Sequence, residues 1–222
     1  LSAKEKGAAA ALVPQAAGEN ALSAGIPLLR VQDTRLSLGQ LAANWRNRFT
    51  LPLIAVTGSN GKTTVKEMIA AILRQATAGG EVTMNAPTER ILATEGNLNN
   101  DIGVLLMLLR LRQQHRYAVI EMGMNHVGEI GYLTQLAKPG VAVITNAGAA
   151  HIEGLGSVET VARAKAEIFA GLDQQGTAVI NADDRYAALW RECAGARKIV
   201  DFGLREKAAV SAEYQADRLS NR

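Results

Sequence analysis

The stretch LPLIAVTGSNGKTTVKEMIAAIL, residues 51–73, contains an apolar run, a glycine turn and a helix-like segment in direct succession. The apolar run shows no alternation with polar residues, which is typical of a strand buried on both faces of a sheet. Gly58 and Gly61 allow a tight turn, and a helix is predicted from about Lys62. A strand, a glycine turn and a helix in this order indicate a parallel α/β sheet.

Further apolar runs bounded by turn residues follow, with helix-like segments between them. This alternation predicts a doubly wound parallel sheet flanked by helices. The polar segment 76–95 is predicted to be a long loop, and no clear strand is expected after Leu204. The expected strands are 51–58, 117–123, 141–148, 177–184 and 198–203. The expected helices are 62–75, about 98–111, 125–137 and 157–171.

A smaller α/β piece is predicted before Thr50, with the change of unit near residues 49–52. We therefore expect a partial N-terminal domain over 1–49 and a central domain over 50–222 that is incomplete at its C-terminal end. The chain begins with Leu rather than Met, which suggests a fragment. The segments that indicate the smaller piece are GAAAALV (7–13), IPLLRVQD (26–33) and TRLSLGQLAANWRNR (34–48).

Composition restricts the classes of partner. The 222 residues carry a net charge of +3 with no block of like charge, so electrostatics does not indicate a nucleic-acid partner. The apolar run at 102–109 is much shorter than the roughly 20 residues needed to span a bilayer, so no membrane insertion is expected. The single cysteine, Cys193, cannot form an internal disulfide, which favours a reducing cytoplasm.

The glycine turn has the composition of a phosphate-binding loop. Gly58 and Gly61 allow the backbone to approach a ligand closely, and the free N–H groups at the start of the next helix face into the loop. Lys62 can neutralise the β and γ phosphates of a nucleotide, and the hydroxyl of Thr63 or Thr64 can bind Mg²⁺. A bound nucleoside triphosphate is the favoured interpretation, and the alternative is a turn without a ligand.

The spacing of these glycines differs from the common pattern G-x-x-x-x-G-K-[ST]. Val56 stands where the first glycine of that pattern is expected, and Gly58 follows two places later. The loop is therefore a shorter G-x-x-G-K-T variant.

Glu121 ends the apolar run YAVIE. Ligand sites in open α/β sheets lie at the carboxyl ends of the strands, and a carboxylate is costly to bury there without a partner. A magnesium ion shared with nucleotide phosphates would satisfy it. The alternatives are a solvated glutamate or a carboxylate paired with a nearby arginine.

Lys165 falls within an apolar stripe if residues 157–172 form a helix capped by Ser157. A lysine that points into protein loses hydration, its pKa falls, and the neutral amine can add carbon dioxide to become a metal-binding carbamate. The alternative is a side chain that extends its ammonium group to the surface. The stripe consists of Val158, Val161, Ala162, Ile168 and Phe169.

His151 lies in a glycine-rich loop just after the predicted strand 141–148. It is expected at the same sheet edge as Lys62 and Glu121, where it either contacts metal or phosphate or is an ordinary loop histidine. The polar segments 95–103 and 181–184 are turn and cap residues or a substrate-facing surface.

Six segments together resemble the central domain of the Mur ligases, and they occur in the order found in that family. The residues before them resemble the end of the family's N-terminal domain, so the resemblance covers most of the chain. The segments are TGSNGKTTVKEM (57–68), GNLNNDIG (96–103), YAVIEMGMNHVGEI (117–130), TNAGAAHIEGLGS (145–157), ARAKAEIF (162–169) and INADD (180–184).

The resemblance implies ATP-dependent amide bond formation in peptidoglycan precursor synthesis in the bacterial cytoplasm. The sequences of these motifs are most similar to those of members that join D-alanyl-D-alanine to UDP-N-acetylmuramoyl-tripeptide. In that reaction ATP phosphorylates the terminal carboxylate of the peptide, and the incoming amine attacks the acyl phosphate. A monomer is expected.

The resemblance also implies roles for individual residues. Thr63 and Glu121 would hold one magnesium ion, and His151 with a carbamylated Lys165 would hold a second. Lys62, His151 and Lys165 would take part in catalysis. ATP would be held by Gly58, Ser59, Asn60, Gly61, Lys62, Thr63 and Thr64. The acceptor peptide would lie near Asn97, Asn99 and Asn100.

The sequence differs from the family pattern because several segments of that pattern are absent. Members begin with a uridine-nucleotide-binding segment and continue into an adenine-contacting segment and a third domain. None of these three parts has a counterpart in this sequence. We therefore expect a partial ligase that is inactive alone. The alternatives are another ligase of the superfamily, such as a folylpolyglutamate synthase, or a phosphate-binding module without ligase activity. The latter predicts an unmodified Lys165 and a single metal site.

Overall fold

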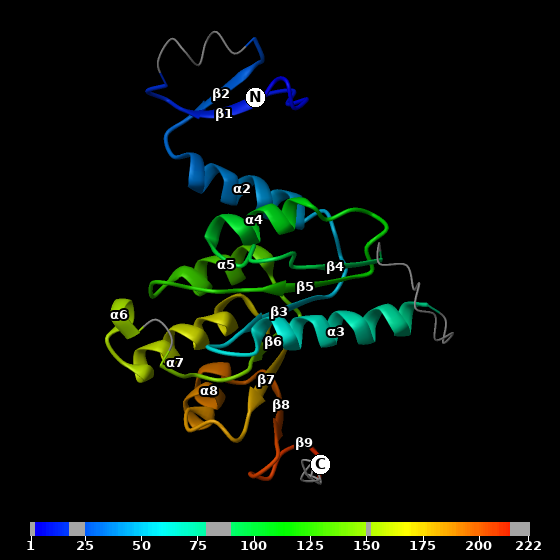
Figure 1. Cartoon of the computed structure of the whole chain (residues 1–222), viewed down its shortest axis with the longest axis vertical. Helices are drawn as coiled ribbons and strands as arrows, with labels where there is room; N and C mark the ends of the chain where they lie inside the picture. Colours follow the sequence, from blue (N-terminus) through cyan, green and yellow to red (C-terminus); the bar gives the residue numbers. More distant parts are fainter. Residues whose placement is uncertain (1–2, 18–24, 79–89, 150–151, 214–222) are drawn as a thin grey trace, which may run out of the picture.

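The computed structural model describes residues 3–17, 25–78, 90–149 and 152–213. Its main feature is a parallel sheet of seven strands in the order β4-β5-β3-β6-β7-β8-β9 (Figure 1). The predicted parallel sheet flanked by helices is therefore confirmed. The strands are β3 (Leu53–Thr57), β4 (Ile91–Ala93), β5 (Tyr117–Glu121), β6 (Val141–Ile144), β7 (Thr177–Asn181), β8 (Lys198–Gly203) and β9 (Val210–Ser211).

Helices cover both faces of this sheet (Figure 1). The long helix α3 (Lys62–Thr77) packs on one face. The other face is covered by α4 (Asp101–Leu109), α5 (Glu129–Ala137), α7 (Val158–Ala166), the 3-10 helix η2 (Glu167–Gly171) and α8 (Ala187–Ala194). A short helix, α6 (Ile152–Leu155), precedes α7.

The strands are buried on both faces, as their continuous apolar runs predicted. In β3, Leu53 and Ala55 join the core under α4, α5 and α7, whereas Ile54 and Val56 join the core under α3. Successive side chains of a strand point to opposite faces, so both faces of β3 require apolar residues. This central strand ends at Thr57, directly before the glycine loop.

The N-terminal residues form a two-stranded parallel unit, β1 (Ala11–Pro14) and β2 (Leu28–Val31), followed by α2 (Thr34–Arg46). Helix α2 packs against α4 and α5 (Figure 1). Arg46 donates from Nε to the carbonyl of Ala137 at the end of α5, at 2.9 Å. The division into domains at residues 49–50 stays a prediction.

Four short elements differ from the prediction, and one of them is α6, which lies in the expected glycine-rich loop. The segment 76–95 was predicted to be a loop, but it contains β4, and residues 79–89 lie outside the described part of the chain. Strand β9 follows Leu204, where no strand was expected, and α8 was not predicted. A strand of two or three residues is too short for a periodicity to show, and pairing with β5 or β8 defines it instead.

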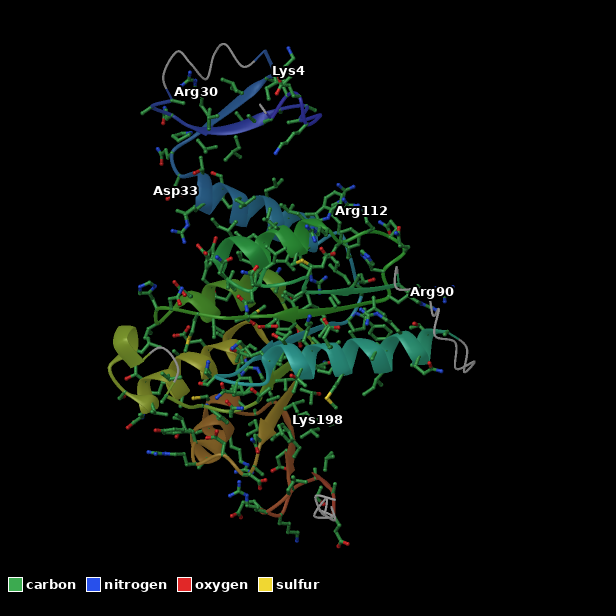
Figure 2. The ribbon with its side chains drawn as sticks, in the orientation of Figure 1. Lys4, Arg30, Asp33, Arg90, Arg112 and Lys198 are labelled. Atoms are coloured by element: carbon green, nitrogen blue, oxygen red, sulfur yellow. The ribbon has the colours of Figure 1, made fainter. Side chains whose placement is uncertain are left out.

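Charged side chains extend outward from elements along the whole molecule (Figure 2). Exposed examples are Lys4 and Arg30 on the two-stranded unit, Arg90 before β4, Arg112 after α4 and Lys198 at the start of β8. Among the described residues, no helix is long and apolar enough to cross a membrane.

Candidate nucleotide and metal site

The strand order places a ligand crevice beside β3. Strand β5 pairs with one edge of β3, and β6, the next strand along the chain, pairs with the other edge. The strand order therefore reverses direction at β3. In open parallel sheets the crevice at the carboxyl ends of such strands is where ligands bind. The loops that follow β3, β5 and β6 meet at this edge, and the first of them is the glycine loop 58–61.

The two glycines of the loop are needed for different reasons. A Cβ atom on Gly58 would lie 1.8 Å from Thr145 Oγ1, so the close approach of the two loops excludes any larger residue. Gly61 has φ +75°, a left-handed conformation that glycine adopts without strain, and it is the N-cap of α3. The N-terminus of α3 therefore opens directly onto the loop, as a phosphate site requires.

The loop after β6 holds the glycine loop in place. Asn60 N donates to Asn146 Oδ1 at 2.9 Å, and Asn146 Nδ2 donates to Asn60 O at 3.0 Å. Thr145 Oγ1 also donates to Asn60 O, and Gly148 N donates to Ser59 Oγ at 2.9 Å. The loop is therefore fixed from outside. Sequence reasoning missed Asn146, which lay within the predicted strand 141–148, whereas the observed strand β6 ends at Ile144.

Lys62 folds back over the loop that precedes it. Its Nζ donates to the carbonyl oxygens of Gly58, at 2.8 Å, and Ser59, at 3.3 Å. Burial lowers the pKa of Lys62, and the nearby carboxylate of Glu121 opposes that shift. The ammonium group thus lies above the loop backbone, where it can reach an anion bound there.

Glu121 is buried at the end of β5, paired in register with Val56 of β3 and only 1% exposed. Its Oε2 accepts from Thr63 Oγ1 at 2.9 Å, and its Oε1 accepts from Asn99 Nδ2 at 2.8 Å. It is therefore not a solvated glutamate, and these partners are not arginines. A carboxylate beside a threonine hydroxyl is the set of hard oxygen donors that Mg²⁺ prefers, so the residues fit such an ion.

Lys165 is also buried, with 2% of its surface exposed, near the end of α7. No hydrogen bond joins its Nζ to another residue in the described part of the chain. Burial, together with the positive charge of Lys62, lowers the pKa of Lys165 to about 7. The side chain as a whole is buried, which disfavours the alternative of a lysine extended into solvent.

His151 lies outside the described residues, so its pairing with Lys165 stays a prediction. Within the described ranges, no group of three or more His, Cys, Asp or Glu side chains is arranged to hold a metal ion. Glu121 with Thr63, and Lys165 near Lys62, are therefore the metal candidates that the structure can place.

A cavity of about 170 Å³ adjoins Lys62 and is lined by Asn99 and Asn100. Asn99 also holds Glu121, and Asn100 caps α4 by accepting from Gly103 N at 2.7 Å. Asn97, the third asparagine of the predicted substrate group, is exposed and does not line this cavity. The structure thus brings two of the three asparagines to the cavity beside Lys62.

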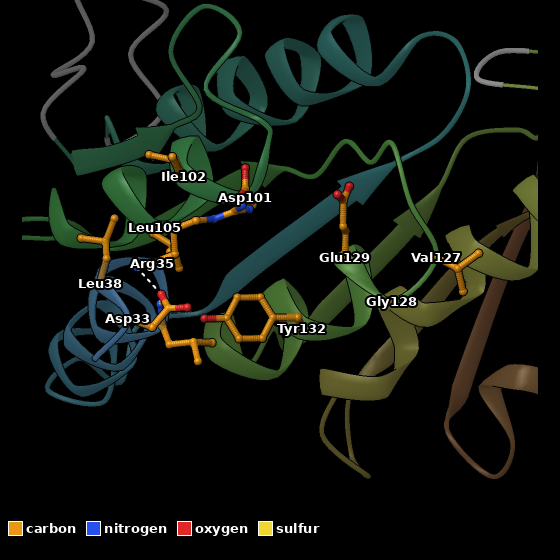
Figure 3. A pocket seen from close by; sticks show the side chains of 11 residues that line it. Asp33, Arg35, Leu38, Asp101, Ile102, Leu105, Val127, Gly128, Glu129 and Tyr132 are labelled. Carbon is orange, nitrogen blue, oxygen red and sulfur yellow. Dashed lines mark hydrogen bonds and ion pairs between the residues drawn. The ribbon is translucent and has the colours of Figure 1, made fainter. Parts of the chain in front are cut away.

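A second cavity, of about 390 Å³, lies between α2, α4 and α5 (Figure 3). It shares Asp101 and Glu129 with the first cavity, so the two adjoin. Its wall includes Tyr132 from α5 and Arg35 from α2, which forms an ion pair with Asp101. The space beside Lys62 therefore continues toward the N-terminal unit.

Sequence reasoning also missed Lys66, which is buried beside Thr94. In the sequence it resembles an ordinary surface lysine of α3. A signal was present, because it lies next to Val65 and one turn before Ala70, positions that pack on the sheet. Its contact with Thr94 depends on β4, which was not predicted.

The fold and the loop define an α/β domain of the phosphate-loop type. Comparison with protein families matches residues 56–221 to the Mur ligase middle domain, and the chain belongs to the Mur ligase family. The class expected from the six motifs is thereby confirmed.

The relatives within the family are more specific. The chain is 47% identical over 190 residues to the UDP-N-acetylmuramoyl-tripeptide–D-alanyl-D-alanine ligase of Haemophilus influenzae, covering 86% of this chain and 39% of that protein. It is 46% identical over 200 residues to the enzyme of the same name from Escherichia coli, covering 90% and 40%. The chain thus spans about 40% of the length of these relatives.

Solved structures give the same result. A crystal structure of MurF from Acinetobacter baumannii matches with a TM-score of 0.75 and 42% identity, covering 87% of this chain and 39% of that one. MurF ligase from Thermotoga maritima, solved in complex with ADP, matches with a TM-score of 0.72 and 26% identity, covering 88% and 48%.

Proposed function

We propose that this chain carries the nucleotide and coupling site of an ATP-dependent ligase that joins D-alanyl-D-alanine to UDP-N-acetylmuramoyl-tripeptide. The observation that carries the proposal is the grouping of Lys62, Glu121 and Lys165 at one sheet edge, around a preformed glycine loop. Relatives with that name at 46–47% identity support the choice of substrates. A likeness to FolC from Escherichia coli, at 18% identity, shows the fold alone.

The proposed chemistry has two steps. A carboxylate oxygen of the tripeptide attacks the γ-phosphorus of ATP, and ADP leaves, which gives an acyl phosphate. The amine of D-alanyl-D-alanine then attacks the acyl carbon, phosphate leaves, and one proton is released. In the first step, the negative charge on the transferring phosphoryl group must be neutralised. In the second step, the acyl phosphate must stay bound in the site.

The nucleotide would lie on residues 58–64, with its phosphates on the N–H groups at the start of α3 and on the ammonium group of Lys62. The complex of the Thermotoga maritima relative with ADP supports an adenine nucleotide as the ligand. Thr63 and Glu121 would hold one magnesium ion, which neutralises phosphate oxygens when bound. Of the predicted acceptor contacts, Asn99 and Asn100 line the cavity beside Lys62.

Lys165 would hold a second ion as a carbamate. Its neutral amine adds to the carbon of carbon dioxide with loss of one proton, and the product is an anion at a position where a cation is costly to bury. The burial of the side chain, the lack of a hydrogen-bond partner among the described residues and the lowered pKa support this role. His151 is proposed as the other ligand. A monomer in the bacterial cytoplasm stays a prediction.

Phosphate release from ATP tests the proposed function. The whole protein is assayed with ATP, the tripeptide nucleotide and D-alanyl-D-alanine, and with each omitted in turn. Sustained release that requires all three, with one amide formed per phosphate, is the expected result. Release that ignores the amine, or amide formation without ATP, would contradict the proposal. Lys62→Met serves as the control for a contaminating ATPase.

A further inference from the structure

Lys66 is a buried cation that the proposed chemistry does not use. It lies one helical turn after Lys62 on α3, with 1% of its surface exposed. Its Nζ donates to Thr94 O at 2.8 Å and to Glu67 Oε1 at 2.5 Å. Lysine is rarely buried unless it is paired, and an apolar side chain of similar length would avoid the desolvation cost. The ion pair alone does not explain the burial, because Glu67 lies largely in solvent.

The internal partner of Lys66 leads to the metal candidate. Thr94 follows β4 and is buried. Its N–H donates to Val119 O at 3.0 Å, its carbonyl accepts from Lys66, and its Oγ1 accepts from Glu121 N at 2.8 Å. A continuous chain of hydrogen bonds therefore runs from the ammonium group of Lys66 to the backbone of Glu121.

The segment after Thr94 approaches Glu121 a second time. Asn99 donates from Nδ2 to Glu121 Oε1, and its carbonyl accepts from Gly123 N at 2.7 Å. Strand β4, which leads into this segment, has three residues and lies at the edge of the sheet, and among the described residues it pairs with β5 alone. So short a ladder fixes its end weakly, and the bond from Lys66 adds an anchor from α3.

We propose that Lys66 is a positioning residue for the divalent cation site. It fixes Thr94, and through Thr94 and Asn99 it fixes the direction of the Glu121 carboxylate. Outer partners of metal ligands act in this way, and their loss typically weakens metal binding by about 10–100-fold. The inference rests on the proposed function only in taking the cation to be the one bound with the nucleotide.

Mn²⁺ binding tests this role directly. Mn²⁺ is titrated into the protein with a saturating non-hydrolysable ATP analogue, and free Mn²⁺ is followed by electron paramagnetic resonance. Lys66→Met is expected to weaken Mn²⁺ affinity by about tenfold or more, while affinity for the analogue without metal changes less than about twofold. Glu67→Gln is the matched control, because its amide oxygen still accepts from Lys66 and the bond to Thr94 remains. Its Mn²⁺ affinity is expected to stay within about twofold of the original.

A second readout needs neither metal nor turnover. Exchange of the Glu121 amide hydrogen, measured by NMR relative to amides of β6, reports whether Thr94 Oγ1 still accepts that bond. Lys66→Met and Thr94→Val are each expected to speed this exchange by about tenfold, and Glu67→Gln is expected to leave it unchanged.

Unchanged Mn²⁺ affinity and unchanged Glu121 exchange in Lys66→Met would overturn the inference. If Lys66→Met does not fold, Thr94→Val decides in the same way, since it breaks the same chain of bonds at the other end. The proposed function fails separately. A protein that forms no amide, yet binds Mn²⁺ with the nucleotide in a Lys66-dependent manner, would remove the ligase assignment and keep the positioning role.

Discussion

Lys66 on α3 and Lys165 on α7 are both almost fully buried near the carboxyl ends of the strands, yet their surroundings differ. Lys66 has an acceptor on β4 and a carboxylate beside it. Lys165 has no hydrogen-bond partner among the described residues, and Lys62 repels its charge. The Nζ of Lys66 therefore has two acceptors, whereas the surroundings of Lys165 disfavour its charged form.

This difference distinguishes a positioning role from a reactive one. A lysine with acceptors at its Nζ fixes the groups that accept its hydrogen bonds. An unpartnered lysine in the same apolar surroundings favours its neutral form, which is the form that reacts with an electrophile such as carbon dioxide. Lys66 has such acceptors, and Lys165 has none within the described ranges.

Turnover should separate the two lysines most strongly. Lys165→Met is expected to lower the rate of amide formation by on the order of 10³, because the proposed ligand of the second ion is lost. Lys66→Met should lower it by only about tenfold, and excess Mg²⁺ should restore most of that loss. Initial rates over a range of Mg²⁺ concentrations measure both. Equal losses, or rescue of Lys165→Met by Mg²⁺, would erase the distinction.

The preformed loop should be the next most sensitive feature. Gly58→Ala is expected to weaken ATP binding by on the order of 100-fold, because the new Cβ would meet Thr145 Oγ1 and displace the loop backbone proposed to bind phosphate. Titration calorimetry measures the affinity. Gly140→Ala is the control, since a Cβ added there, at the opposite end of the sheet, would meet no described atom within 4 Å. Normal ATP affinity in Gly58→Ala would show that the loop is not the phosphate site.

Stability should change with opposite sign at the two lysines. In buffer free of carbon dioxide, Lys165→Met is expected to raise the free energy of unfolding by about 1–4 kcal/mol, because an unpaired buried amine is replaced by an apolar side chain of similar volume. Lys66→Met should lower it by about 1 kcal/mol, because the buried carbonyl of Thr94 loses its donor. Urea denaturation measures both. A loss of stability in Lys165→Met would mean that Lys165 has a partner in the fold.

The pH dependence of stability should show the smallest effect. The pKa of Lys165 is lowered to about 7, so between pH 7 and the ordinary lysine value the unfolded chain binds one proton more than the folded chain. The free energy of unfolding of the unchanged protein should therefore rise with pH in this window, by up to about 1.4 kcal/mol per pH unit, relative to Lys165→Met. Parallel pH profiles of the two proteins, in buffer free of carbon dioxide, would contradict the lowered pKa.

Much of the fold and part of the site follow from the sequence alone. Continuous apolar runs identified the five long strands, because burial on both faces leaves no room for polar residues. The place of Lys62 and Glu121 at one edge followed from the parallel arrangement. Strand β4 could not be predicted, because three residues are too few to show a periodicity. Without β4, the role of Lys66 could not be inferred either. For Lys165, helical periodicity left burial and solvent exposure open, and packing decided between them.

The central claim is that Lys165, which has no partner among the described residues, is the reactive lysine, and ¹³C NMR with labelled bicarbonate tests it most directly. The unchanged protein should show one protein-bound carbamate signal above about pH 7, where the amine of Lys165 becomes neutral. The signal should disappear in Lys165→Met and persist in Lys66→Met. No carbamate signal at saturating bicarbonate, or a signal that survives Lys165→Met, would contradict the account.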